Sequence, residues 1–159
     1  MEAYQVTQAL MSVGTVYHVR RPREDALLYT VRGELMSPTP KFHLVEGEAG
    51  RELALLHANF IKTKYEVLIE GTSRASIVFP AVALKKTLTL VVGAEEYAAD
   101  GGVFKGVFRC KKPDGAVALE ITKELSLRDT FAVKVDESLP LEVALLSAVA
   151  IHSRFYEMV

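Results

Sequence analysis

The C-terminal segment from Leu139 to Phe155 places the strongest constraint on the fold of this chain. Between Leu141 and Ile151 only Glu142 and Ser147 are polar. A helix on a protein surface shows a polar face, whereas a helix that is apolar nearly all round must be enclosed by other parts of the chain. The segment therefore predicts a buried helix over about residues 139–156. Ser138 is the expected N-cap, with Pro140 in the first turn and Arg154 near the far end.

The rest of the chain, from about residue 4 to 136, follows a period of two, which is typical of β-strands. Tyr65, Val67 and Ile69 fall on one face of a predicted strand, and Glu66 and Leu68 fall on the other. Similar runs occur at Phe42–Val45, Leu53–Leu55, Val117–Ile121 and Phe131–Val135, and turn signals such as Lys112-Pro113-Asp114-Gly115 separate them. Many short strands at this spacing predict an antiparallel sandwich or barrel.

The strand region also contains a possible internal repeat. The order Phe42, Gly50, Leu53, Tyr65 is followed at nearly the same spacing by Phe108, Gly115, Val117, Phe131. Two β-meander halves, about 4–70 and 74–136, would then share one domain that covers residues 1–159. Coincidence among β-rich strings is the other interpretation. A repeat favours a closed barrel, because closure leaves no exposed strand edge.

Several motifs together resemble the LURP-one-related family, which shares the tubby C-terminal-like fold with the phospholipid scramblases. They are Tyr4-x-Val6-x-Gln8, Tyr29-x-Val31-x-Gly33, Phe42-x-Leu44, Gly50-x-x-Leu53 and Asp129-Thr130-Phe131 before the apolar terminal segment. The resemblance implies a mainly-β fold: a closed antiparallel barrel of about twelve strands around a hydrophobic C-terminal helix. The membrane segment and calcium site of the scramblases have no counterpart in this sequence, so lipid transport is not implied.

Composition narrows the choice of partners and compartment. The formal net charge is -1, which gives no overall field for nucleic acid, and Cys110 is the single cysteine, so no internal disulfide can form. No apolar run reaches the ~18–20 residues of a transmembrane helix, and the N-terminus lacks the basic start of a secretory signal. We therefore expect no nucleic-acid partner, no transmembrane segment and a cytoplasmic protein, free or attached peripherally to a membrane.

Catalytic and metal motifs are not found in the sequence. There is no nucleophile elbow, phosphate-binding loop or zinc-protease motif, so we expect no enzyme, no catalytic residue and no cofactor. His43 and His57 are expected to face opposite sides of neighbouring strands, which disfavours a metal site. Cys110 is expected to be buried and inert, and His152 to be solvated or capped near the helix end.

One local feature points to binding. Lys105, Arg109 and Lys111 are expected on one face of a strand and form a basic stripe with Lys112 on an otherwise neutral protein. The family resemblance implies an anionic phospholipid head group as ligand, and a protein partner is the other candidate. An ordinary solvated strand face also explains the stripe. Two further basic groups, Arg20, Arg21 and Arg23 and then Lys62 and Lys64, could equally be solvated faces. The predicted function is non-enzymatic binding or scaffolding; the alternative is a structural or oligomerising module without a small ligand, with outward residues such as Leu68 at its interface.

Overall fold

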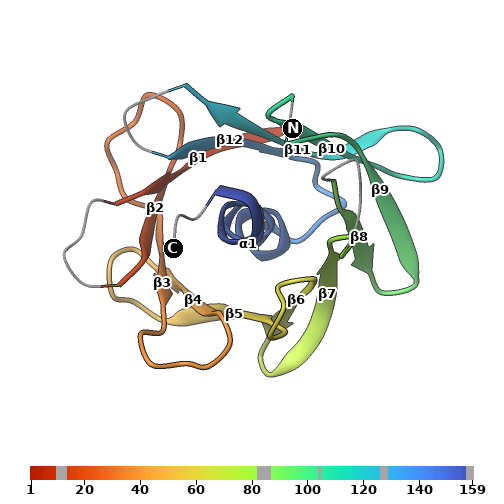
Figure 1. The fold of residues 1–159 in the computed structure, drawn as a ribbon. Helices are drawn as coiled ribbons and strands as arrows, with labels where there is room; N and C mark the ends of the chain where they lie inside the picture. The colour runs from red at the N-terminus through yellow and green to blue at the C-terminus, as the bar shows by residue number, and fades with distance from the viewer. Residues whose placement is uncertain (10–13, 82–86, 104, 126–128, 157–159) are drawn as a thin grey trace.

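Twelve antiparallel strands form a closed barrel around a helix in the computed structural model (Figure 1). The structure describes residues 1–9, 14–81, 87–103, 105–125 and 129–156. The strands are β1 Glu2–Gln8, β2 Val16–Arg20, β3 Tyr29–Gly33, β4 Lys41–Glu46, β5 Glu52–Ala58, β6 Lys64–Ile69, β7 Thr72–Val78, β8 Thr89–Val92, β9 Glu95–Gly102, β10 Val107–Lys111, β11 Val117–Glu124 and β12 Thr130–Val135. The predicted fold class is confirmed.

The strands follow one another around the barrel in sequence order, and β1 closes the ring by pairing with β12. In the closing ladder Tyr4 lies opposite Val133 and Val6 lies opposite Phe131. Every strand therefore has two neighbours, and no edge is left to pair with another chain. Because successive strands run in opposite directions, the connections alternate between the two ends of the barrel.

The period of two in the sequence corresponds to the inner and outer faces of the wall. Tyr65 and Val67 are buried on the inside of β6, whereas Glu66 and Leu68 are partly exposed on the outside. Side chains on successive strand residues point to opposite faces, so an alternating strand buries one face against the barrel interior.

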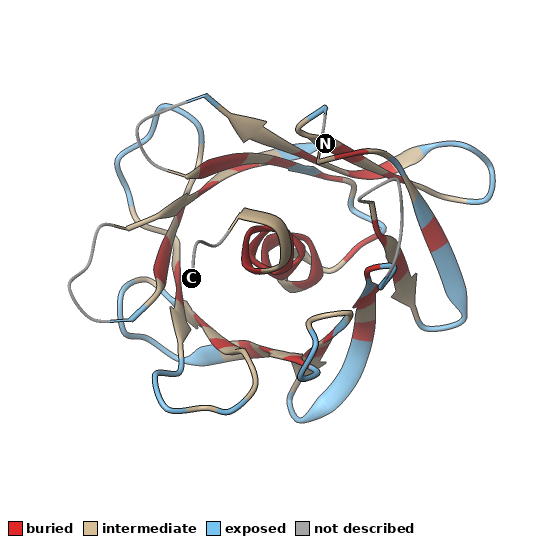
Figure 2. Ribbon diagram, viewed as in Figure 1, coloured by how far each residue is buried: buried red, intermediate tan, exposed pale blue. Residues whose placement is uncertain are grey.

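The central helix α1 spans Leu141–Ile151 and continues into a π-helical segment, η1, at His152–Tyr156. Every residue from Val143 to Ile151 is buried, as the red central helix of Figure 2 illustrates. The N-cap is Pro140, and the expected cap by Ser138 is wrong, because the Ser138 hydroxyl bonds to the Asp136 carboxylate at 3.0 Å. The prediction of an enclosed helix is confirmed.

Hydrogen bonds attach the end of this helical segment to the wall. His152 is 1% exposed; its Nδ1 lies 2.6 Å from the Tyr17 hydroxyl, and its Nε2 lies 2.7 Å from Asp129. The Tyr65 hydroxyl bonds to the Ser153 hydroxyl at 2.8 Å. The expectation that His152 is solvated is wrong, because the helical segment is still inside the barrel at this position.

The central helix begins at one end of the barrel, and the helical segment that follows it ends at the other. Glu142, at the start of α1, lies near the β4 residue Glu46 at one end. The segment η1 lies at the other end, beside Asp129, just before β12. We call the latter the C-terminal end of the barrel; it carries the connections β1–β2, β3–β4, β5–β6, β7–β8, β9–β10 and β11–β12.

Candidate functional site

The basic stripe predicted from the sequence lies on the barrel wall, where carboxylates balance most of it. Arg109 and Lys111 share the outer face of β10, as expected. Arg109 Nε lies 3.0 Å from a Glu120 oxygen on β11, and Lys111 Nζ lies 3.3 Å from an Asp100 oxygen on β9. Neighbouring strands thus supply one carboxylate for each of these two cations.

The other two candidates differ in their surroundings. Lys112 Nζ lies 2.7 Å from Asp136, and this hydrogen bond raises the pKa of the lysine. Lys105 is exposed and precedes β10, in a turn closed by its N–H bond to the Gly102 carbonyl at 3.2 Å. The expectation that Lys105 lies on the strand is wrong, because the turn interrupts the strand. Anion binding by these four residues stays a prediction.

His43, His57 and Cys110 all lie on strands of the barrel wall. His43 and His57 both lie on the outer face, so their expected opposite orientation is wrong; on β5 it is Ala54 and Leu56 that point inward. His43 contacts Glu52, and His57 lies 3.1 Å from the Thr39 hydroxyl. Cys110 is buried as expected, and burial raises the pKa of its thiol to about 12.

No group of metal-ligating side chains large enough to hold a metal ion occurs among the described residues. Within the same residues, no helix is long and apolar enough to cross a membrane.

The exposed apolar side chains gather at the C-terminal end of the barrel. Six of the seven large apolar side chains that are exposed in the described chain belong to this end, and Met1 is the seventh. The six are Leu35 and Met36 in the β3–β4 connection, Phe60 and Ile61 in the β5–β6 connection, Val78 at the end of β7, and Leu125 after β11. These six side chains make this end the candidate for an interaction surface, because contiguous apolar patches on a protein surface mark such sites.

The β5–β6 connection presents its apolar residues on a well-bonded turn. The Asn59 side chain accepts hydrogen bonds from the backbone N–H groups of Thr63 and Lys64 at 2.8 and 3.1 Å, and it donates one to the Thr63 hydroxyl at 2.7 Å. At its tip Phe60 and Ile61 are 78% and 66% exposed. We call these two residues, together with Leu35 and Met36, the apolar tips.

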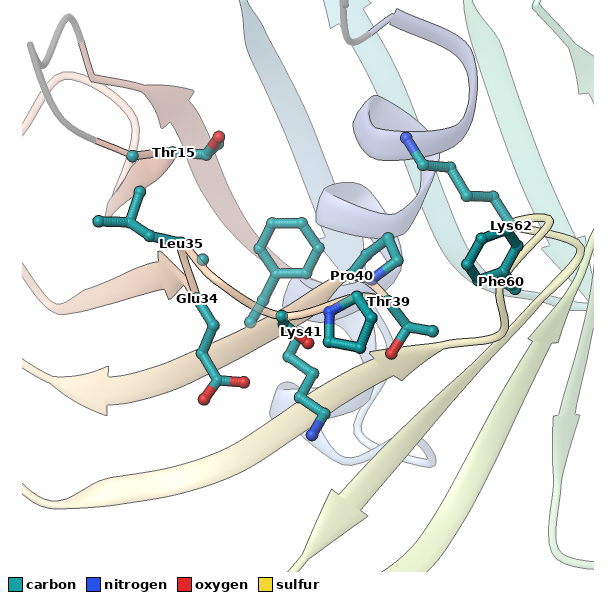
Figure 3. A pocket seen from close by; sticks show the side chains of 13 residues that line it. Thr15, Glu34, Leu35, Thr39, Pro40, Lys41, Phe60 and Lys62 are labelled. Carbon is teal, nitrogen blue, oxygen red and sulfur yellow. The ribbon is translucent and has the colours of Figure 1, made fainter.

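The β3–β4 connection lies beside this turn. The Ala58 N–H, at the end of β5, donates a hydrogen bond to the Pro40 carbonyl at 2.9 Å. Between the two connections lies an open cavity of about 430 Å³, lined by Leu35, Lys41, Phe60 and Lys62 among others (Figure 3). In this view the ammonium groups of Lys41 and Lys62 point in opposite directions, so they do not converge on one ligand.

The apolar tips were not predicted from the sequence, because they lie in connections, where catalytic motifs and charge runs give no signal. The available signal was the pair of adjacent apolar residues, Leu35-Met36 and Phe60-Ile61, each within a connection that short polar residues usually occupy.

A comparison with solved structures finds a protein that shares this fold. No protein-family model matches the sequence, and no curated protein matches it. The X-ray structure of the Arabidopsis thaliana protein AT5G01750 matches 94% of this chain and 88% of that chain, with a TM-score of 0.60 and 13% sequence identity. At this identity the likeness shows a shared fold.

Proposed function

We propose that this protein is a non-enzymatic binding or scaffold protein that attaches to anionic phospholipid surfaces through the C-terminal end of its barrel. The observation that supports this function is the gathering of exposed apolar side chains at that end, beside lysines. The buried side chains of wall and helix form one cluster along the barrel axis, so binding is expected on the outside. We also propose that the protein resembles the LURP-one-related family in function as well as in fold.

The charges at this end favour an anionic surface. Lys41 and Lys105 lie there, as does Lys62, whose ammonium group donates to the Ser153 carbonyl at 3.4 Å, whereas Glu34 and Glu124 oppose them and Lys64 lies 3.5 Å from Glu66. At roughly 1 kcal/mol for each cation near an anionic membrane, the three lysines contribute at most about 3 kcal/mol, or about a hundredfold enrichment, before the two carboxylates are subtracted. This attraction is electrostatic and does not select a particular head group.

Vesicle co-sedimentation tests the function. We expect the protein to bind vesicles that contain phosphatidylserine and to bind vesicles of phosphatidylcholine alone at least about tenfold more weakly. Lys41→Gln plus Lys62→Gln should weaken the binding to anionic vesicles. The matched control, Arg109→Gln plus Lys111→Gln, removes the same charge from the wall and should leave binding unchanged. Absence of binding to both vesicles would remove the proposal, and loss of binding in the control alone would move the site to the basic stripe.

The second candidate is an oligomerising module without a small ligand. Leu55 and Leu68 lie directly opposite each other on the outer faces of β5 and β6, where they form an apolar pair on the wall. An interface between two copies would cover such a pair. Static light scattering over micromolar concentrations tests it, since a strictly monomeric mass would exclude this function.

A further inference from the structure

We infer that the apolar tips enter the hydrocarbon region of the bilayer, so that the barrel stands end-on upon the membrane. This inference rests on the proposed function and adds to it an apolar contact and an orientation. The tips belong to two connections at the same end of the barrel, and both connections line the same cavity.

The exposure of the tips fits a fluid apolar partner. Met36 is 95% exposed and Phe60 is 78% exposed, so neither side chain rests against the barrel wall. Side chains that project in this way from two separate turns can each sink into lipid without a complementary solid surface. Each would gain the free energy of removing its apolar area from water.

Four backbone N–H groups at the base of the β5–β6 turn are bonded within the turn, which lowers the cost of bringing this turn towards a medium of low polarity. The N–H of Lys62 bonds to the Asn59 carbonyl at 3.2 Å, and the N–H groups of Thr63 and Lys64 bond to the Asn59 side chain. The Asn59 N–H donates to the Lys64 carbonyl at 2.9 Å. A backbone group left without a partner in hydrocarbon would cost several kcal/mol, and this turn avoids that cost at these positions.

The lysines beside the tips suit the boundary between hydrocarbon and head groups. Lys41 and Lys62 line the cavity next to Leu35 and Phe60, and the Lys62 ammonium group donates a hydrogen bond to the Ser153 carbonyl at 3.4 Å. A lysine such as Lys41 can lay its aliphatic stem against lipid while its ammonium group stays among the phosphates. Glu34, which lines the same cavity, is the one carboxylate among the cavity residues and is expected to remain in water.

A single introduced tryptophan tests the depth directly, because the protein contains no tryptophan of its own. Phe60→Trp places the fluorophore at an apolar tip, and Ala49→Trp places it in the exposed β4–β5 turn at the opposite end of the barrel. With phosphatidylserine-containing vesicles, the Phe60→Trp emission should shift to the blue and fall about twofold or more when the lipid chains carry bromine, since the tip would lie within reach of the quencher. The Ala49→Trp emission should do neither.

Affinity provides a second measurement. Phe60→Ser plus Ile61→Ser should weaken binding to these vesicles about 100-fold, which is about tenfold for each side chain removed from lipid. The control, Leu27→Ser plus Val91→Ser, changes two half-buried apolar residues, in the β2–β3 connection and on β8, and should bind within about twofold of the original protein.

The outcomes separate the two proposals. Vesicle binding without quenching of Phe60→Trp, together with an unchanged affinity of the tip variant, would overturn the insertion and leave surface attachment standing. Quenching of Ala49→Trp to the same extent would overturn the end-on orientation. Failure of the original protein to bind any vesicle would overturn both the insertion and the proposed function.

Discussion

Replacing Leu145 by alanine should destabilise the protein strongly, because Leu145 is at the centre of the buried helix. The side chain is 0% exposed and belongs to the single core cluster that helix and wall share. Removing it leaves a cavity that the closed wall cannot easily collapse into, so the cost should lie at about 3 kcal/mol within a usual range of roughly 2–5. For a chain of 159 residues that corresponds to a fall in Tm of roughly 6–12 °C.

Urea denaturation followed by circular dichroism measures this loss. The midpoint should fall while the slope of free energy against urea stays the same, because the variant exposes the same surface on unfolding. Leu55→Ala, on the outer face of β5, is the matched control and should cost less than about 1 kcal/mol. If Leu145→Ala costs no more than Leu55→Ala, then the helix does not fill the barrel and the reasoning fails.

Three further results are expected. The Cys110 thiol should not react with a thiol reagent near neutral pH until the protein unfolds, because burial raises its pKa to about 12; prompt reaction of the native protein would contradict this. Tyr17→Phe should cost about 1–3 kcal/mol in urea denaturation, since it leaves His152 Nδ1 buried without its partner, and a neutral effect would refute the role of this bond. For Asp129, burial acts to raise the pKa, but hydrogen bonds from Lys123 and His152 outweigh it and hold the pKa below the ordinary 3.8. A carboxyl whose pKa is lowered in the folded protein adds stability that is present above pH 3.8 and is lost as the pH falls through the folded pKa. Asp129→Asn should therefore flatten the acid side of a plot of unfolding free energy against pH. An unchanged plot would contradict the hydrogen bonds of Asp129 with Lys123 and His152.

The fold was predictable because its two signals are local. The absence of a polar face between Leu141 and Ile151 predicts an enclosed helix, and the alternation through Tyr65 and Val67 predicts a half-buried strand. Details that depend on distant partners were not predictable. The sequence around His152 gives no sign of Tyr17 and Asp129, which come from two other parts of the barrel and enclose the imidazole.

The binding surface was harder to predict than the fold for a physical reason. Arg109 and Lys111 look like a basic stripe in sequence, but Glu120 and Asp100 reach them only once β9, β10 and β11 are side by side. Conversely, Phe60 lies far from Leu35 in the chain, and the barrel brings their connections to one end. The pairing of cations with carboxylates and the clustering of apolar side chains both depend on which strands and connections become neighbours in the folded barrel. Neither can therefore be predicted from the sequence of a single strand.

Hydrogen–deuterium exchange of the unmodified protein, with and without phosphatidylserine-containing vesicles, tests most directly whether the C-terminal end of the barrel is the binding surface. Vesicles should slow exchange in the β3–β4 and β5–β6 connections, at residues 34–40 and 59–63. Exchange in the β4–β5 turn at the opposite end, and along β10, should not change. Slowed exchange along β10 with no change in these two connections would contradict the account.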